Sequence, residues 1–251
     1  MTDANETRGS AGDAIALIIA MGFPSLMSWL EFRVLPAMGG GEHNPALQSA
    51  FALGKAIQFA LPLMYVNRAV WRGRPPVWPG TFQRVGLGPG IVFGLVVAAG
   101  TLGLYFLWLK DTPVFESVGE RVHGWLKQFN LANPTGYLLM AAFISVPHSF
   151  LEEYYWRWFV FGWLRKFVPL PWALALSALA FMSHHVIVLS VYLEGYFWEA
   201  AVPFSLCVAG GGVVWAWLYH RTGSLLGPWL SHLIVDVSLM LLGYDLLRHY
   251  W

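Results

Sequence analysis

Apolar stretches long enough to cross a lipid bilayer recur along this 251-residue chain. The hydrocarbon core of a membrane is about 30 Å thick, and an α-helix needs roughly 20 apolar residues to cross it. Lipid offers no partners to free backbone groups, so segments of this kind must be helical. We therefore predict an all-α, polytopic membrane helix bundle with seven spans. The spans are predicted near residues 14–37, 47–67, 88–109, 136–165, 171–192, 198–219 and 224–244.

The fourth stretch is longer than one crossing requires and contains Pro147. Proline removes a backbone hydrogen bond and kinks a helix. The stretch is therefore one tilted, kinked helix or two shorter pieces, and the second option would give eight spans. Polar links separate the stretches, and residues 110–136 form the longest of them.

Composition supports a membrane protein and excludes some partners. Charged residues make up 12% of the chain, about half the share in an ordinary soluble domain. The net charge is +1 and the basic residues are dispersed, so nothing indicates nucleic acid binding. The lipid bilayer is the expected environment, and the sequence leaves the oligomeric state open.

Basic residues predict the orientation, because Lys and Arg accumulate in cytoplasmic loops. If the amino terminus is cytoplasmic, the larger set of basic residues lies inside. The chain has eleven Arg and only four Lys and is rich in Ala and Gly, which indicates a GC-rich bacterial gene. We therefore predict a bacterial inner-membrane protein with its amino terminus in the cytoplasm. The inner set is Arg8, Arg68, Arg72, Arg74, Arg84, Arg165, Lys166 and Arg221, and the outer set is Arg33, Lys110, Arg121, Lys127 and Arg248.

Ionisable side chains lie near the centres of three predicted spans, where their cost is high enough to mark a working site. Glu152, His185 and His232 each fall within about four residues of the middle of a span, so all three lie within ~6 Å of the midplane. Residues four apart share one face of a helix. Such pairs are Glu153 with Arg157, Phe181 with His185, and His232 with Asp236.

Spacing suggests separate roles for these groups. Glu153 and Arg157 are predicted to form an internal ion pair, which offsets the cost of burying either charge. Glu152, about 100° away around the helix, is left without a local basic partner and can act as a general base. Imidazoles such as His232 can carry protons or donate to an oxyanion, and Asp236 can fix the tautomer of His232.

Other readings of the same residues stay open. Glu152, His185, His232 and Asp236 are a possible ligand set for Zn²⁺ or another divalent metal bound between helices. His148 lies one turn before Glu152 and can contact the site, while Phe181 is expected to form a wall. A histidine in a membrane helix often only makes an interhelical hydrogen bond, and we assign His184 a packing or hydrogen-bonding role.

These motifs resemble the CPBP family of intramembrane proteases, which includes CAAX prenyl endopeptidases and bacteriocin-processing (Abi) proteins. The family is marked by Glu-Glu-x-x-x-Arg, Phe-x-x-x-His and His-x-x-x-Asn/Asp on successive core helices. The resemblance covers about residues 136–244. It implies one integrated membrane domain in which residues 1–135 hold a polar tail and three spans and residues 136–251 hold the catalytic core. The matching residues are Glu152, Glu153, Arg157, Phe181, His185, His232 and Asp236.

The resemblance implies an endopeptidase of glutamic type that requires no cofactor, with a metal-dependent version as the near alternative. Glu152 and His185 would activate a water, His232 and position 236 would stabilise the oxyanion, and Glu153 and Arg157 would support the site. The expected substrate is a membrane-associated protein or peptide cleaved near its carboxyl-terminal end. Prenyl endopeptidases have Asn at the position of Asp236. An Asp must be protonated to donate as Asn does, or it polarises His232 or binds a metal.

A function of a different class is a non-proteolytic membrane protein. A bacteriocin-immunity or envelope scaffold would tolerate alanine at Glu152 and His185. A proton-coupled carrier would use buried Glu and His as a relay. Carriers often show paired inverted repeats with broken helices, and no such symmetry is evident in the sequence.

Overall fold

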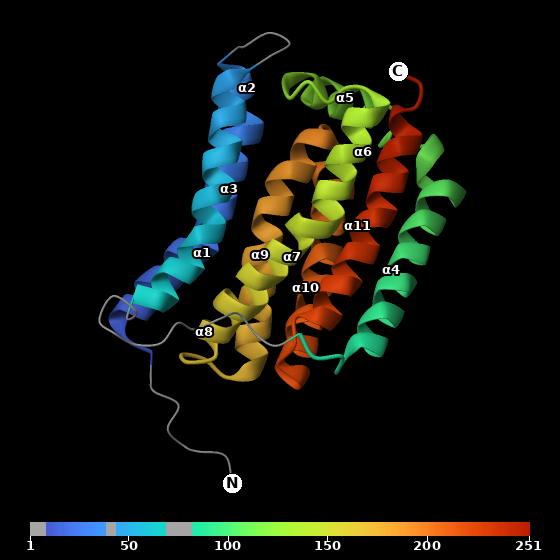
Figure 1. The fold of residues 1–251 in the computed structure, drawn as a ribbon. Coiled ribbons are helices and arrows are strands. Elements are labelled where there is room, and N and C mark those ends of the chain that lie inside the picture. Colours follow the sequence, from blue (N-terminus) through green and yellow to red (C-terminus); the bar gives the residue numbers. More distant parts are fainter. Residues whose placement is uncertain (1–8, 39–43, 69–81) are drawn as a thin grey trace.

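The computed structural model describes residues 9–38, 44–68 and 82–251, and within them it contains helices and no strand (Figure 1). The predicted all-α class is confirmed. The elements are α1 (Ala11–Trp29), η1 (Leu30–Val34), α2 (Leu35–Ala37), α3 (Pro45–Val66), α4 (Leu87–Leu107), η3 (Leu109–Asp111), α5 (Val118–Gln128), α6 (Pro134–Phe143), η4 (Ile144–His148), α7 (Ser149–Glu153), η5 (Tyr154–Phe161), α8 (Gly162–Leu164), α9 (Leu170–Tyr192), η6 (Phe197–Ala201), α10 (Val202–Thr222) and α11 (Leu226–Leu247).

Six helices in the described residues are long and apolar enough to cross a membrane. A seventh crossing is the helical run of residues 134–164, which carries the charged residues of the predicted site. Large apolar side chains point outward along the bundle, and Trp108, Trp172 and Trp198 are exposed at helix ends, where interfacial anchors lie. The chain is a multi-pass integral membrane protein. The six helices are Ala11–Ala37, Pro45–Val66, Leu87–Leu107, Leu170–Tyr192, Phe197–Thr222 and Leu226–Leu247.

Local sequence signals explain several helix boundaries. Asn44 and Asn133 cap α3 and α6 by accepting from backbone N–H groups three residues later, and each is followed by a proline at the first helical position. Gly223 ends α10 in the left-handed conformation with φ of 64°, which glycine adopts without strain.

Residues 134–164 form one helical run and not two separate helices. Pro147 lies in η4, where the backbone widens to a π-helix, and a second π segment, η5, follows α7. Proline accounts for the first widening, because it cannot donate the usual helical hydrogen bond. Of the two options for the long fourth stretch, the structure therefore favours the single kinked helix.

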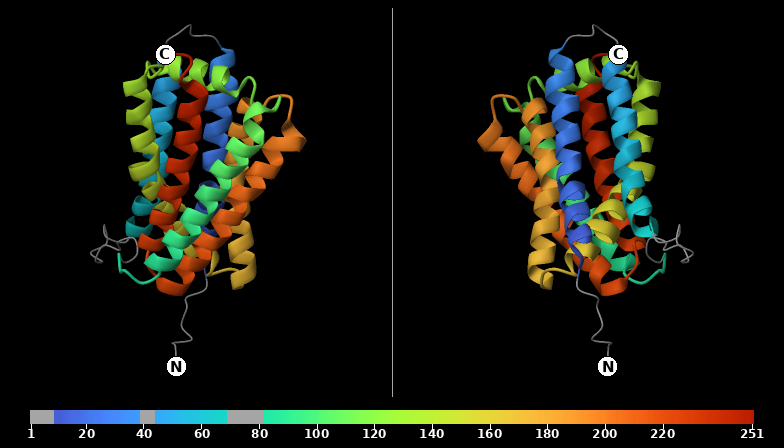
Figure 2. Two further views of the ribbon diagram at one scale, coloured as in Figure 1. Left: turned by 90° about the vertical axis from the view of Figure 1, so that its right-hand side faces the viewer. Right: turned by 90° about the vertical axis from the view of Figure 1, so that its left-hand side faces the viewer.

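The topology places the start of α1 and the carboxyl terminus at opposite ends of the bundle, as predicted for seven crossings (Figure 1). The described members of the larger basic set lie at the end where α1 begins, and Arg8, Arg72 and Arg74 lie outside the described residues. The longest predicted link is only partly irregular, because it contains the amphipathic helix α5. This helix lies across the end of the bundle near the carboxyl terminus (Figure 2).

Helix packing brings the three polar spans together. The helix α11 packs against α4 and α7, and α9 packs against α1 and α10. Glycines allow α4 to lie close to α11. A Cβ built on Gly94 would lie 2.9 Å from the backbone oxygen of Ser231, the residue before His232. The position of α11 is thus set by direct backbone contact on the side away from α7.

Candidate active site

Glu152 lies on α7 with 5% of its surface exposed, and three imidazoles surround its carboxylate. Nε2 of His148 and Nε2 of His184 lie 3.6 and 3.7 Å from Oε1, and Nε2 of His232 lies 3.7 Å from Oε2. These distances are just beyond hydrogen-bond reach, as is common for catalytic groups before substrate binds. The prediction that Glu152 lacks a local basic partner is wrong. His148 lies one turn earlier on the same helical run, and two other helices supply the remaining histidines.

Glu153 is fully buried and connects two other side chains of the site. Its Oε2 lies 3.0 Å from Nε of Arg157, which confirms the predicted ion pair. Its Oε1 lies 2.7 Å from Nδ1 of His232. A carboxylate can only accept, so the Nδ1–H group donates and the tautomer of His232 is fixed from this side. Sequence reasoning gave that role to Asp236, whose Oδ1 lies 3.6 Å from the other ring nitrogen, Nε2.

Arg157 is 1% exposed, and aromatic rings complete its surroundings. The guanidinium carbon lies 4.7 Å from the ring centre of Phe181 and 5.0 Å from that of Trp215. The guanidinium makes no hydrogen bond within the described residues, so these two ring faces and Glu153 stabilise its charge. Phe181, predicted as a wall of the site, therefore also stabilises a buried cation.

The ring of His232 is held in one orientation. It stacks on Trp215 with ring centres 4.3 Å apart and an interplanar angle of 14°. Trp215 is itself fixed, because its Nε1–H donates to Oγ of Ser231 over 2.9 Å. With Nδ1 bonded to Glu153, the free nitrogen of His232 is Nε2, which faces both Glu152 and Asp236.

The neighbouring histidines of α9 point to different partners. His184 stacks on Trp156 and brings its Nε2 toward Glu152. Nδ1 of His185 lies 3.1 Å from the carbonyl oxygen of Phe181. A carbonyl only accepts, so this Nδ1 carries the proton and Nε2 of neutral His185 is left as an acceptor. His184 can thus donate to the carboxylate while His185 can take a proton.

The residues proposed as a metal site do not fit one as they are placed. Within the described part of the chain, no group of three or more His, Cys, Asp or Glu side chains is arranged to hold a metal ion. Nδ1 of His185 faces the Phe181 carbonyl and Nδ1 of His232 is bonded to Glu153, so each of these two histidines offers only its Nε2 atom to a further partner. The side chains as they lie are instead placed to exchange protons with a water molecule.

Sequence reasoning missed two aromatic residues and underrated one histidine. Trp215 lies on α10, which carries none of the motifs, and only the folded arrangement brings it to His232. Trp156 could have been noticed because it precedes Arg157 directly. His184 adjoins His185, but helix-face arguments from one motif could not reveal which of the two faces α7.

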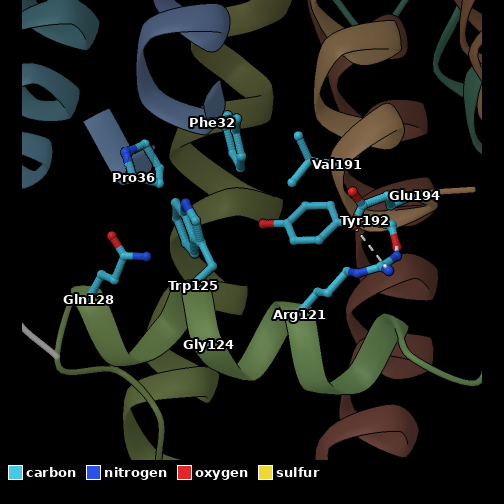
Figure 3. Close-up of a pocket in the computed structure, with 9 residues that line it drawn as sticks. All are labelled: Phe32, Pro36, Arg121, Gly124, Trp125, Gln128, Val191, Tyr192 and Glu194. Atoms are coloured by element: carbon cyan, nitrogen blue, oxygen red, sulfur yellow. Dashed lines mark hydrogen bonds and ion pairs between the residues drawn. The ribbon is translucent and has the colours of Figure 1, made fainter. Parts of the chain in front are cut away.

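A separate pocket of about 330 Å³ lies near the carboxyl-terminal end of the bundle. Figure 3 shows Phe32 and Pro36 on one side of it, Trp125 and Arg121 of α5 on another, and Tyr192 at the end of α9. Arg121 donates to the Tyr192 carbonyl over 3.1 Å and pairs with Glu194 at 3.3 Å. None of the motif residues lines this pocket.

Residues 134–238 match the family model described as type II CAAX prenyl endopeptidase Rce1-like. The predicted family resemblance is confirmed. The Rce1-like segment begins at the first residue of α6, ends within α11 and contains every motif residue. At the level of the family, the match indicates a CAAX-protease-like peptidase of the membrane. No curated protein and no solved structure matches the chain.

Proposed function

We propose that this protein is an intramembrane endopeptidase of glutamic type that hydrolyses a peptide bond near the carboxyl-terminal end of a membrane-associated protein or peptide. The observation that carries the proposal is the buried carboxylate of Glu152, surrounded by the Nε2 atoms of three histidines. The Rce1-like match supports the peptidase class. The distribution of Lys and Arg supports a cytoplasmic amino terminus in a bacterial inner membrane.

The first step is attack by water on the scissile carbonyl. Glu152 takes a proton from the water, and the water oxygen bonds to the carbonyl carbon while the carbonyl π electrons move onto oxygen. The acceptor Nε2 of His185 helps to position and polarise this water. His184 and His148 hold the carboxylate of Glu152 by donating toward it.

The oxyanion formed in this step needs a hydrogen-bond donor. His232 can supply one from Nε2 when it is protonated, because its Nδ1–H is committed to Glu153. A protonated Asp236 beside the same nitrogen can supply a second. The C–N bond then breaks, and the proton held by Glu152 passes to the leaving amine.

Comparative proteomics tests this proposal even though the substrate is not identified. Membrane and secreted proteins are compared between cells that carry the wild type and cells that carry Glu152→Ala. We expect at least one protein to accumulate uncleaved in the Glu152→Ala cells. Identical protein termini in both strains would refute the protease and favour a scaffold.

Asp236→Asn should keep most of the activity, within roughly tenfold of the wild type, because Glu153 rather than Asp236 fixes the tautomer of His232. An ionised Asp cannot donate, so wild-type activity should fall as the pH rises through the ionisation of Asp236. The Asn amide donates at every pH, and this alkaline loss should disappear. The measurement is kcat/KM against pH, with Asp245→Asn on the same helix as the control. A loss well beyond tenfold would show that Asp236 orients His232 instead.

Metal chelators should leave activity unchanged, because the side chains are not arranged as a metal site. Purified protein would be assayed after incubation with 1,10-phenanthroline, and its metal content would be measured by mass spectrometry. Stoichiometric zinc in the protein, together with a loss of activity that added zinc restores, would contradict this expectation.

A further inference from the structure

Lys55 is a cation near the middle of α3, on the face of that helix that points into the bundle. The same face carries Phe51 one turn before it and Phe59 one turn after it. Phe51 packs edge-on against Trp125, and Phe59 packs edge-on against His148 of the candidate site, with ring centres 5.9 Å apart. The Lys55 ammonium lies over the ring of Phe51, 5.7 Å from its centre.

The charge of Lys55 has little compensation at this depth. The buried cation Arg157 is paired with Glu153, whereas no ion pair within 4 Å engages Lys55 in the described residues. One acidic group that interacts with Lys55 is Glu31 on η1, which is 2% exposed and has one carboxylate oxygen without a hydrogen-bond partner in the described part. Lys55 interacts electrostatically with Glu31 on one side and with His148 and His184 on the other.

Packing between α1 and α3 places Glu31 and the Lys55 ammonium at the same level of the bundle. Gly54 lies so close to α1 that an added Cβ would overlap the side chain of Met27. Glu31, on η1, lies one turn beyond Met27 of α1 along the same helical run. Phe51 lies about one turn from Gly54 in the same direction, because α1 and α3 run antiparallel (Figure 1). The carboxylate of Glu31 and the ammonium over Phe51 are therefore at the same level.

We infer that Lys55 binds the carboxylate at the carboxyl terminus of the substrate, and so determines how far from the chain end the peptide bond is cut. Holding an unpaired cation at membrane depth costs free energy, and an anion that pairs with the cation removes much of this cost. A peptide cleaved near its end supplies that anion as its terminal carboxylate. The inference rests on the proposed endopeptidase function and assigns a specificity-determining residue to it.

The separation between Lys55 and Glu152 fits a short tail. Phe59 is level with His148. The Lys55 ammonium lies over Phe51, two turns from this level toward the carboxyl-terminal end of the bundle, whereas the Glu152 carboxylate lies beside His148. The eight residues from Phe51 to Phe59 correspond to about 12 Å along the bundle. An extended peptide covers this distance with about three or four residues.

The test uses a defined peptide library in two forms. Each peptide carries an amino-terminal palmitoyl chain and six randomised carboxyl-terminal residues, and it ends in either a free carboxylate or a carboxamide. Cleavage by purified protein in lipid vesicles is followed by mass spectrometry. We expect the wild type to prefer the carboxylate form by roughly tenfold to a hundredfold, the size of a charge-assisted hydrogen bond. We also expect the cut to lie about three or four residues from the end.

Variants separate recognition from a structural role. Lys55→Gln should lose the preference while cleaving the carboxamide form at the wild-type rate, and Lys55→Arg should keep the preference. Glu31→Gln should keep or increase the preference for the carboxylate form, because it removes an anion that competes with the substrate for Lys55. Arg33→Gln, which changes an exposed cation bonded to Ser190 on α9, is the matched control and should have no effect.

Three outcomes would overturn the inference: a wild type that cleaves both forms equally, a Lys55→Gln variant that keeps the preference, or one that loses activity equally on both forms. The proposed function fails differently, because in that case the wild type cleaves neither form.

Discussion

Replacing Glu152 by Gln is expected to lower kcat/KM by about 10²–10⁴-fold, the contribution of a positioned general base. Gln has nearly the same shape and can still accept a hydrogen bond, but it cannot take the proton that water must lose. His148 and His184 keep an acceptor at Oε1, so the bundle should remain folded. The measurement is the rate of peptide cleavage by purified protein in lipid vesicles, together with thermal unfolding of the same preparation.

A matched variant shows whether the loss is specific to Glu152. Glu199→Gln makes the same chemical change at an exposed residue of η6, away from the histidines, and should leave the rate unchanged. If Glu152→Gln retained wild-type cleavage, Glu152 would not be the general base and the glutamic mechanism would be refuted.

Arg157→Met is expected to cause the largest loss of stability, about 3–5 kcal/mol in the free energy of unfolding. The substitution leaves the fully buried Glu153 carboxylate without its cation, and the hydrogen bond from the imidazole of His232 remains. It also removes the charge held between Phe181 and Trp215, although the methionine fills much of the space. The measurement is chemical unfolding in detergent, followed by tryptophan fluorescence.

The double variant Glu153→Gln/Arg157→Met separates charge from packing. Gln removes the unpaired charge and still offers an oxygen to Nδ1 of His232, so most of the lost stability should return. If the double variant is as unstable as Arg157→Met, the loss comes from packing around the guanidinium. An unchanged unfolding curve for the single variant would show that the ion pair contributes nothing to stability.

Hydrophobicity alone predicted a helical bundle with seven crossings, because a bilayer fixes helix length within narrow limits. The same reasoning missed α5. An 11-residue helix lying across the end of the bundle is too short and too polar to register as a span. Its apolar face, which includes the buried Val118 and Leu126, was the available signal.

Partners within one helix were predictable from spacing, and partners between helices were not. Spacing of four residues correctly paired Glu153 with Arg157. It could not reveal that Glu153 also reaches His232, because the rotation of α11 relative to α7 depends on packing along both helices. Contacts between helices cannot be read from spacing within one helix. For this reason sequence reasoning assigned the fixing of the His232 tautomer to Asp236 and not to Glu153, and it gave His184 less weight than His185.

The close contact between α4 and α11 bears on how far the protein can be shortened. The Rce1-like segment begins after α4, so α4 lies outside the part of the chain that carries the motifs. Yet Gly90 and Gly94 let the backbone of α4 lie directly against Gly227 and Ser231 of α11, and Ser231 is the residue before His232. Lipid tails cannot supply a rigid surface of that shape. A shortened protein built from residues 136–251 would keep every motif residue and lose the support that sets the depth and rotation of His232.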